Sequence, residues 1–465
     1  MRILHAIHDF LPRHRAGSEI YAFDLCRELA ARHHVSIVCA EYDAARRHGS
    51  VTWRVYEGLQ VVEVVNNWAC ASFEETYRPP LIADRLAHVL QAIQPDVVHA
   101  HNLLNLTFDL PVLAARYGAP VVATLHDYTL VCPSGGQRIH RAEQHVCRDI
   151  DVSRCVRCFR ESPFYAQMSF AKASALALGT SVAGRTASAL SRAARRFPAL
   201  GRHLSRAASR VPHVSLSEAE IEGRMDAARE VFRDVDTFVA PSASIAAEFG
   251  RLGLDRSKIR VSDYGFVPLR RVPRNGTPPA LRIGYAGTLV WHKGVHVLVD
   301  AVRSLPASGY QLKIFGSPDV FPDYAADLRS RAAGLPVVFM GEFARDRSAD
   351  VYGQIDVLVV PSLWLENSPL VIHEAFMAGV PVVGARIGGI ADLVDDGRNG
   401  RLYDPTSPVE LGAILRELLA DRRALSTLSE GVRNTPVKSI AADAREWEAI
   451  YADALARHAS SRPGA

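Results

Sequence analysis

Two glutamates stand eight positions apart in PSLWLENSPLVIHEAFMAG, residues 361–379, and Pro369 lies between them. Because proline interrupts a helix but suits its first turn, the spacing predicts a loop that carries Glu366 and a helix that carries Glu374. Carboxylates are strong acceptors for hydroxyl groups. The pair therefore predicts a site for a molecule that has hydroxyls at two separated places.

The start of the predicted helix adds a third binding element between the two carboxylates. Ser368 suits the N-cap, Pro369 the first helical position, and Gly379 follows the last turn. The N–H groups of Leu370 and Val371 would then attract an anion. A nucleotide sugar, with phosphate between two hydroxyl-bearing groups, has this shape. The alternative is that Glu366 only favours the helix dipole and Glu374 is a solvated helix residue.

Two other turns before helices carry residues suited to phosphate. The segment GYAGTLVWHKGVHVLV places Lys293 near Gly287 and Gly294, where its charge would neutralise a diphosphate, unless it is an ordinary exposed lysine. The segment HRAGSEIY puts Gly17 at a turn, with Ser18 suited to the N-cap. Glycine at such a turn lets the backbone approach a phosphate closely.

Alternating apolar runs and amphipathic stretches must position these residues. The first 130 residues predict strands at RILHAI, VSIVCA, LQVVEVV, DVVHAH and PVVATLH, with helices at SEIYAFDLCRELAAR and LIADRLAHVLQAI. The pattern stops at Cys132 and resumes at DTFVAPS, from residue 236. A second set of predicted strands is LRIGYAG, QLKIFG, PVVFMG, DVLVVPS and VPVVGA.

This order predicts an α/β protein with two doubly wound, Rossmann-like domains. The first is residues 1–266 with an insertion at 132–235, and the second is residues 281–438. The Pro-rich stretch 267–280 is predicted as a linker, and residues 439–465 as a helix that crosses back to the first domain. Ligands bind beyond the carboxyl ends of such strands, so both domains are expected to face one cleft. The apolar face of the last helix comprises Trp447, Ile450, Tyr451 and Leu455.

Composition excludes several classes of protein. The chain has 465 residues, 48% hydrophobic and 22% charged, which is ordinary for a globular protein. A formal charge of +4 is too small to indicate nucleic acid as a partner. No run of eighteen apolar residues is present, and MRILHAIHDF predicts a strand rather than a signal peptide. Cys26, Cys39 and Cys70 fit a reduced core, so we expect a cytoplasmic protein.

The combined motifs resemble a known family. GTLVWHKG together with ENSPLVIHEAFMAGVPVVGARIGGIADLVDDGRNGRLYDP resembles the donor domain of the family 4 retaining glycosyltransferases, which have the GT-B fold. AGSE, PDVVHAHN and TLHDY resemble the acceptor domain of that family. The likeness covers about residues 1–131 and 230–455.

The resemblance implies roles for individual residues. Glu366 would contact the donor hexose, Glu374 the ribose and Lys293 the diphosphate, while His126 would approach the sugar at the reaction centre. Many members carry Arg directly after the glycine of the second loop, where this chain has Thr288. Catalysis would then rest on His126, Glu366 and Lys293. The implied donor-binding set is Gly17, Gly287, Thr288, Lys293, Glu366, Asn367, Ser368, Leu370, Val371 and Glu374.

The family retains the anomeric configuration, and no acidic residue is placed by the sequence as a nucleophile. Two carboxylates about 5–5.5 Å apart would indicate double displacement. The resemblance instead implies same-face attack by the acceptor, assisted by an oxygen of the departing diphosphate. No catalytic metal is expected, since the D-x-D strings at 149–151 and 234–236 fit structural roles.

The insertion holds four cysteines in CPSGGQRIHRAEQHVCRDIDVSRCVRC. The closing C-x-x-C has the spacing of a metal knuckle, and two further cysteines complete a tetrahedral set for structural Zn²⁺. Disulfides and reduced thiols are the alternatives, and His140 or His145 is an alternative to one of the cysteine ligands. The set is Cys132, Cys147, Cys155 and Cys158.

Residues 160–212 carry nine Lys/Arg and one acidic residue. Leu200, Leu204 and Val211 fall on one helical face and arginines on another, which is typical of a helix that lies on an anionic membrane. This would suit a lipid-linked acceptor at the inner membrane surface. A solvated helix packed on the acceptor domain is the alternative.

Together these features predict a glycosyltransferase that moves a hexose from a nucleotide-diphosphate sugar to a saccharide or lipid-linked glycan, in cell-surface polysaccharide synthesis. A sugar phosphorylase or a nucleotide-sugar epimerase on the same fold is the enzymatic alternative. The E-x7-E segment disfavours the epimerase more than the phosphorylase. A non-catalytic scaffold that binds nucleotide sugar is the other alternative. Thr288 favours the scaffold, whereas the presence of Lys293, Glu366, Glu374 and His126 opposes it.

Overall fold

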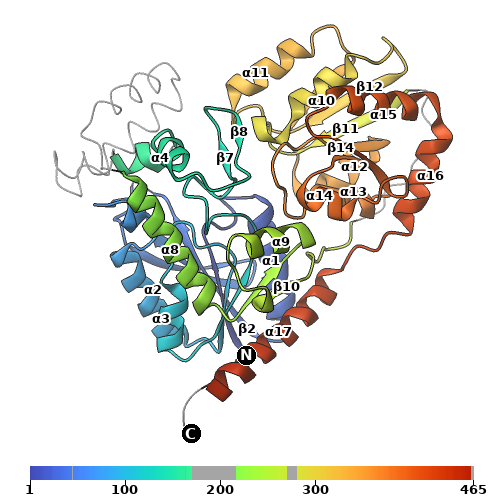
Figure 1. Cartoon of the computed structure of the whole chain (residues 1–465). Helices are drawn as coiled ribbons and strands as arrows, with labels where there is room; N and C mark the ends of the chain where they lie inside the picture. Colours follow the sequence, from blue (N-terminus) through green and yellow to red (C-terminus); the bar gives the residue numbers. More distant parts are fainter. Residues whose placement is uncertain (44, 163, 170–215, 270–279, 462–465) are drawn as a thin grey trace. The chain divides into compact units, whose positions relative to one another are not determined.

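The computed structural model describes all residues except 44, 163, 170–215, 270–279 and 462–465 (Figure 1). The chain forms two compact units. Unit 1 comprises residues 1–240, 248–261 and 441–465, and unit 2 comprises residues 241–247 and 262–440. Residues 241–247 and 262–266, which the sequence analysis assigned to the first domain, cluster with unit 2.

Unit 1 is built on an eight-stranded sheet in the order β10-β9-β6-β5-β1-β2-β4-β3. All neighbouring strands are parallel except the β3–β4 pair. The strands are β1 Arg2–Ile7, β2 His34–Glu41, β3 Val51–Tyr56, β4 Leu59–Val65, β5 Val97–Ala100, β6 Val121–Thr124, β9 Thr237–Ala240 and β10 Ile259–Val261.

Helices connect these strands and cover the sheet, as expected for a doubly wound fold. In the parallel strands nearly every residue is buried, so the chain shows continuous apolar runs there instead of alternation. The helices are α1 Gly17–Ala30, α2 Pro80–Ile93, α3 Leu110–Arg116, α4 Val152–Arg160, α8 Glu218–Asp234, α9 Ala243–Arg251 and α17 Ile440–Ser461.

Unit 2 has a six-stranded sheet in the order β13-β12-β11-β14-β15-β16, and every neighbouring pair is parallel. The strand order therefore reverses between β11 and β14, which is the topological switch point of a Rossmann-type sheet. The strands are β11 Leu281–Ala286, β12 Tyr310–Phe315, β13 Val337–Gly341, β14 Val357–Val360, β15 Val382–Ala385 and β16 Gly400–Tyr403.

Seven helices are described in unit 2 beside this sheet. The strands and the apolar helix faces form one continuous core that includes Leu281, Leu298 and Val357, all fully buried. The helices are α10 Val295–Val302, α11 Pro322–Arg331, α12 Ser348–Gly353, α13 Leu370–Met377, α14 Gly388–Leu393, α15 Pro408–Ala420 and α16 Arg422–Arg433.

The C-terminal helix α17 packs on unit 1. Trp447, Ile450 and Tyr451 are buried, and the Trp447 indole N–H donates to the Tyr21 hydroxyl at 2.9 Å. Leu455, assigned to the same face, is half-buried. The helix that ends the chain therefore stabilises the unit that begins it.

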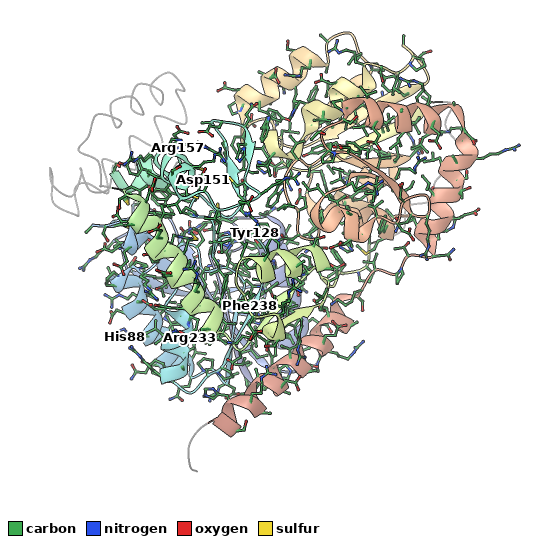
Figure 2. All side chains as sticks on the ribbon, in the orientation of Figure 1. His88, Tyr128, Asp151, Arg157, Arg233 and Phe238 are labelled. Carbon is green, nitrogen blue, oxygen red and sulfur yellow. The ribbon has the colours of Figure 1, made fainter. Side chains whose placement is uncertain are left out.

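The insertion after residue 132 begins with a two-stranded hairpin, β7 Ile139–His140 and β8 His145–Val146. Helix α4 follows, and the Asp151 carboxylate caps it by accepting a hydrogen bond from the Arg154 backbone N–H at 3.0 Å (Figure 2). Helix α8 ends the insertion. The predicted basic face with Leu200, Leu204 and Val211 lies outside the described residues.

The sequence patterns did not predict the hairpin strands β7 and β8, and in the two large sheets they did not predict β3, β10 and β16. The β3 strand is half exposed, with Trp53 45% exposed, so its sequence has no continuous apolar run. Strands β10 and β16 have three and four residues and carry arginine at their second position. Among the described residues, no helix has the length and apolar character needed to cross a membrane.

Candidate donor site

Lys293 and Glu366 form an ion pair at the switch point of unit 2. Lys293 Nζ lies 2.6 Å from Glu366 Oε1, and the Ser362 hydroxyl donates to the same oxygen at 2.6 Å. Lys293 lies in the loop after β11 and Glu366 in the loop after β14. Because β11 and β14 are neighbours in the sheet, the loops at their carboxyl ends meet.

The environment of the pair leaves one carboxylate oxygen available. Glu366 is 6% exposed, and among the described residues no hydrogen bond reaches its Oε2. Lys293 Nζ also lies 5.3 Å from the centre of the Trp364 ring, a cation–π contact that limits the positions of the ammonium group. Oε1 is thus anchored by Lys293 and Ser362, while Oε2 can accept a hydroxyl from a ligand.

Glycines allow these loops to approach one another. Gly294 has φ +69°, and a Cβ there would lie 1.8 Å from the Pro361 carbonyl oxygen. A Cβ on Gly389 would lie 1.4 Å from the Asn367 carbonyl oxygen, and the Gly389 N–H donates to the Glu366 carbonyl at 2.7 Å. Only glycine fits either position. The Gly388–Gly389 pair, which the sequence analysis used only as part of a family motif, therefore holds the backbone of the Glu366 loop.

Helix α13 begins one residue later than its sequence predicts. Pro369 is the N-cap and Leu370 the first helical residue, and no side chain caps the helix. Ser368 is not the cap because its hydroxyl donates to Asp263 at 2.6 Å and lies 2.8 Å from His373 Nε2. The first-turn amides of Leu370 and Val371 still stand at the open end of the helix. Gly379 ends the helix as predicted, with φ +74°.

Glu374 lies on the second turn of α13 and is half-buried. The buried Tyr352 hydroxyl donates to Glu374 Oε2 at 2.8 Å. Burial, with the neighbouring carboxylate, raises the pKa of Tyr352 well above its usual value, so it remains a donor. Glu374 is therefore held in place by a tyrosine of α12.

The loop after β11 places Gly287 and Thr288 at the same edge of the sheet. Gly287 has φ +150°, and its N–H donates to the Phe315 carbonyl at 3.0 Å. Thr288 is exposed, and its carbonyl accepts from the buried Tyr285 hydroxyl at 2.8 Å. Gly287, Thr288, Lys293 and Glu366 are thus brought together, whereas Gly17 and His126 belong to unit 1.

Gly17 is the first residue of α1, and Ala16, not Ser18, is the N-cap. No side chain caps this helix either, because Ser18 already lies inside the first turn. Glu19 in the same turn is buried, and its Oε1 lies 3.2 Å from His8 Nε2. The start of α1 is therefore anchored to the loop after β1 by a carboxylate and a histidine.

His126 follows β6 and is half-buried. Its Nε2 lies 2.9 Å from His101 Nδ1, a contact that the sequence analysis did not anticipate. Burial, with a smaller effect of His8, lowers the pKa of His126 to about 3, so the ring is neutral at ordinary pH. The next residue, Asp127, fixes the turn by accepting from the Thr129 N–H at 2.7 Å.

The four cysteines of the insertion are free thiols, and Cys147, Cys155 and Cys158 each interact electrostatically with Cys132. Burial first, and then the other cysteines, raises the pKa of Cys155 to about 12 and that of Cys158 to about 11. The Cys147 N–H donates to the Arg138 carbonyl at 2.8 Å, and Cys132 is buried. Among the described residues, no three of these sulfurs lie within 4.8 Å of one another.

Comparison with known families agrees with the fold. Residues 280–421 match the model described as "Glycosyl transferases group 1", and residues 15–166 match "Glycosyltransferase Family 4". Together these segments make up more than half of the chain. The chain belongs to the family 4 glycosyltransferases, which have the GT-B fold.

Individual relatives are more distant. The chain is 32% identical over 256 residues to a D-inositol 3-phosphate glycosyltransferase of Xylanimonas cellulosilytica, covering 50% of this chain and 60% of the relative. It is 28% identical over 225 residues to the sulfoquinovosyl transferase SQD2 of Arabidopsis thaliana, covering 45% and 43%. The matches thus span less than two-thirds of the length of these relatives.

Two solved structures share the fold over nearly the whole chain. One is Anabaena HepE in complex with UDP and glucose, with a TM-score of 0.60 and 17% identity, covering 97% of this chain and 100% of that one. The other is sucrose-phosphate synthase from Thermosynechococcus elongatus, with a TM-score of 0.65 and 16% identity, covering 98% and 99%. At these identities the likeness shows the fold alone.

Proposed function

We propose that the protein is a retaining glycosyltransferase that moves a hexose from a nucleotide-diphosphate sugar to a saccharide or lipid-linked glycan. The observation that carries the proposal is the Lys293–Glu366 pair at the switch point, beside the open start of α13. Transferase names of the relatives and the UDP-bound state of Anabaena HepE support it. In this proposal the acceptor belongs to cell-surface polysaccharide synthesis, and the transfer takes place in the cytoplasm. The basic segment 160–212 would lie at the inner membrane surface, which would suit a lipid-linked acceptor.

Lys293 and the amides of Leu370 and Val371 receive the diphosphate in this proposal. A cation and a helix start both stabilise negative charge, and the charge on the diphosphate rises as the sugar departs. Because Glu366 holds Lys293 at 2.6 Å, the ammonium group is already positioned before the donor binds. This preorganisation favours the leaving group more than the intact donor.

Glu366 and Glu374 hold the two hydroxyl-bearing ends of the donor. The Oε2 atom of Glu366 would accept a hexose hydroxyl, and Glu374, held by Tyr352, would accept a ribose hydroxyl. The acceptor hydroxyl then attacks from the face that the diphosphate leaves and gives its proton to a diphosphate oxygen. No protein nucleophile and no catalytic metal takes part in the proposed sequence.

The first test measures thermal shifts of the full chain with UDP, GDP, ADP, dTDP and CMP, without and with magnesium. A ligand at a hundred times its Kd adds about 2.7 kcal/mol to the free energy of unfolding, which raises Tm by a few degrees. One diphosphate that stands out without metal supports the donor site. No response to any nucleotide favours a scaffold without a donor site.

A second test separates transfer from phosphorolysis. The protein is incubated with the selected nucleotide sugar and candidate glycans, and the anomeric configuration of the product is read by NMR. Release of nucleoside diphosphate with a retained anomer supports the proposal. Activity that needs inorganic phosphate and an oligosaccharide instead would identify a sugar phosphorylase, and an inverted anomer would overturn the retaining mechanism.

A further inference from the structure

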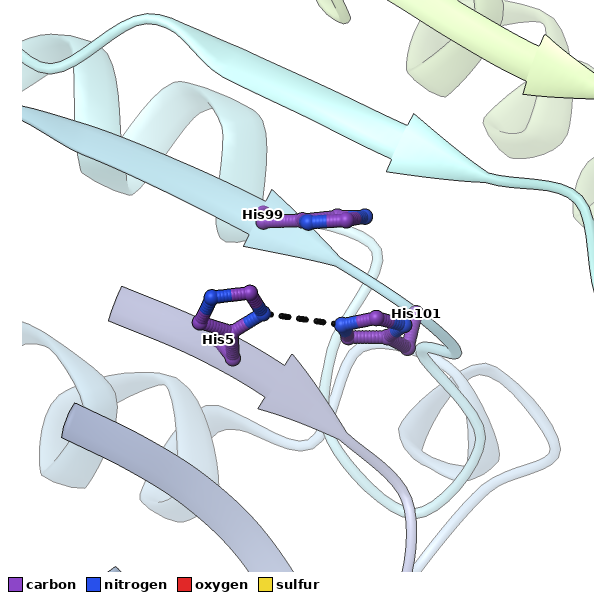
Figure 3. A group of neighbouring side chains, drawn as sticks. All are labelled: His5, His99 and His101. Atoms are coloured by element: carbon purple, nitrogen blue, oxygen red, sulfur yellow. Dashed lines mark hydrogen bonds between the residues drawn. The ribbon is translucent and has the colours of Figure 1, made fainter. Parts of the chain in front are cut away.

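Buried histidines line up across the centre of the sheet in unit 1. His5 on β1 and His99 on β5 are directly opposite partners in the parallel register. His101 follows two residues after His99, and Figure 3 shows its ring beside that of His5. All three are fully or almost fully buried, at 0%, 0% and 2% exposure. Together with His126 they form a cluster of four histidines, and the proposed reaction gives no role to the three buried ones.

Three of these rings are joined end to end. His5 Nδ1 lies 2.9 Å from His101 Nε2, as the dashed line in Figure 3 marks, and His101 Nδ1 lies 2.9 Å from His126 Nε2. A neutral imidazole has one N–H and one lone pair. The chain therefore has two consistent directions, one donating from His5 toward His126 and one donating the opposite way.

The free end of the chain decides between these directions. His5 Nε2 is buried and has no hydrogen-bond partner among the described residues. A buried N–H without an acceptor is rarer in proteins than a buried acceptor without a donor. His5 Nε2 is therefore the lone-pair nitrogen, and the proton of His5 is on Nδ1, from which it is donated to His101.

The remaining assignments follow in order, because each ring holds a single proton. His101 accepts at Nε2, so its own proton is on Nδ1 and is donated to His126 Nε2. His126 accepts there, so its proton is on Nδ1. Burial lowers the pKa of His5 to about 3 and that of His101 well below its usual value, which keeps these rings neutral.

The packing around the chain keeps the rings in place. His99 stacks on His101 with 4.1 Å between ring centres, and its two nitrogens are held by Thr124 Oγ1 at 2.7 Å and the Tyr451 hydroxyl at 2.8 Å. Tyr21 packs edge-on against His126 at 5.6 Å. Tyr451 comes from α17, so the C-terminal helix supports the His99 ring, which stacks on His101.

We propose that His5 and His101 are positioning residues that fix His126 as the Nδ1–H tautomer. His126 then meets the sugar as a hydrogen-bond donor and not as a base. This last step rests on the glycosyltransferase function proposed above, whereas the tautomer itself does not. It also explains how a histidine can take part in a reaction in which the diphosphate takes up the proton of the acceptor.

A metal ion is the competing explanation, since nitrogens of His5, His99 and His101 lie within 4.8 Å of one another. A metal would require His99 to give up Thr124 or Tyr451, and it would replace the His5–His101 hydrogen bond. Each of these bonds is already formed at 2.7–2.9 Å. The observed contacts therefore favour the hydrogen-bonded chain.

The tautomers can be read directly by two-bond ¹H–¹⁵N correlation on the full chain labelled with ¹⁵N-histidine. The spectrum is recorded about two units above the ordinary histidine pKa, so that exposed rings are neutral as well. His88 is an internal reference, because its Nδ1 lies 2.8 Å from the Asp84 carbonyl and must carry the proton (Figure 2). The His126 signals are identified by their loss in His126→Asn.

The expected result is that His126 shows a protonated Nδ1 and an unprotonated Nε2, like the His88 reference. A protonated Nε2 on His126 would overturn the proposal. Stoichiometric metal in the purified protein, bound by unprotonated nitrogens of His5 and His101, would also overturn the proposal.

Two variants of His101 test its positioning role. Asparagine places an amide near the position of Nδ1 and can still donate to His126, whereas leucine of similar size cannot. His101→Leu should lower kcat on the order of tenfold with an unchanged KM for the donor, and the Nδ1–H pattern of His126 should weaken. His101→Asn should restore both. Equal loss in both variants, or a normal His126 pattern in His101→Leu, would contradict the role.

These readouts separate the inference from the proposed function. If the chain transfers no sugar but His126 is protonated on Nδ1, the proposed function fails and the tautomer assignment stands. If transfer occurs and His126 is protonated on Nε2, the proposed function stands and the tautomer assignment fails.

Discussion

Lys293 Nζ lies 2.6 Å from Glu366 Oε1 although the two residues are 73 positions apart in the chain. The family resemblance implied a separate ligand group for each residue, the diphosphate for Lys293 and the hexose for Glu366. The structure joins them because β11 and β14 are neighbours at the switch point of the sheet. The cation and the carboxylate therefore act as one unit, and a change in either residue should affect the other.

Lys293→Met should lower turnover by about 10²–10³-fold, the effect of removing one group that stabilises developing charge. The variant should also lower Tm, because the nearly buried Glu366 loses its counter-charge. Initial-rate kinetics at saturating donor and a thermal melt measure the two effects.

The double variant Lys293→Met/Glu366→Gln separates stability from catalysis. It should regain much of the lost Tm but none of the turnover. Lys313→Met is a matched control in the same unit, since Lys313 Nζ donates a hydrogen bond to the neutral Gln354 Oε1 at 3.3 Å. Unchanged turnover in Lys293→Met would exclude the lysine from leaving-group stabilisation.

Glu374→Gln should weaken nucleotide binding more than it slows transfer. A hydrogen bond to a charged group contributes about 1.5–3 kcal/mol, so Kd for the nucleoside diphosphate should rise roughly 10- to 100-fold. Isothermal titration measures this change. Glu417→Gln, which removes a surface ion pair with Arg401 in the same unit, is the control. An unchanged Kd would show that Glu374 does not contact the nucleotide, as in the alternative interpretation of the sequence.

Gly389→Ala tests whether the glycine pair holds the Glu366 loop. An added Cβ would meet the Asn367 carbonyl at 1.4 Å, so the loop must move and the Gly389–Glu366 backbone bond must break. We expect loss of donor binding and a lower Tm. Gly223→Ala in α8 is the control, because its Cβ would come no closer than 3.9 Å to Tyr77 and alanine favours a helix. A variant that binds nucleotide normally would show that this close approach does not set the site.

Much of the fold could be predicted from local patterns. Buried parallel strands produce continuous apolar runs, and these marked β1, β2, β4 to β6, β9, β11, β12, β14 and β15, while PVVFMG marked the half-buried β13. The family motifs also indicated two loops, those of Lys293 and Glu366, that the structure brings together at the switch point of unit 2. The exposed β3 and the short β10 and β16 lack such runs, so only pairing with neighbouring strands defines them.

Contacts between distant residues were not predictable. Ser368 was predicted to cap α13 from residue preference. Its hydroxyl instead donates a hydrogen bond to Asp263, which lies 105 positions away in the chain. The histidine chain likewise depends on the register of β1 and β5, which places His5 opposite His99. Spacing indicates which face a residue shares with its neighbours, and only the strand order shows which residues it meets.

The neutral buried histidines should make the protein sensitive to mild acid. Burial lowers the folded-state pKa of His5, His99 and His101, so the unfolded chain binds more protons as pH falls below about 6.5. Their contribution to the free energy of unfolding is therefore fully present above that pH. It should be lost at up to about 1.4 kcal/mol per pH unit for each ring as pH falls further.

Guanidinium unfolding between about pH 7.5 and pH 5 measures this slope, above the range where unperturbed carboxylates titrate. His14 acts in the opposite direction, because Glu41 raises its pKa. His5→Asn should reduce the slope, whereas His88→Gln at an exposed site should leave it unchanged. Equal stability across the range would mean that the buried rings are protonated or accessible.

The four cysteines of the insertion are predicted to bind one structural Zn²⁺. Zinc–sulfur distances of about 2.3 Å would require the sulfurs to come closer together than they do in the free thiols. Metal analysis of protein purified without chelator should find one zinc per chain. Because the pKa of Cys155 and of Cys158 is already raised to about 12 and about 11, low thiol reactivity alone would not show zinc.

The informative measurement is thiol labelling before and after a chelator is added. Four thiols should become reactive only after chelation, and Cys155→Ser should lose the metal and lower Tm, because metal binding is linked to folding. Cys70→Ser is the control, since Cys70 is buried and lies outside the insertion. Labelling that is unchanged by chelator, in protein that contains no zinc, would leave the insertion with reduced thiols. Loss of free thiols without metal would show disulfides instead.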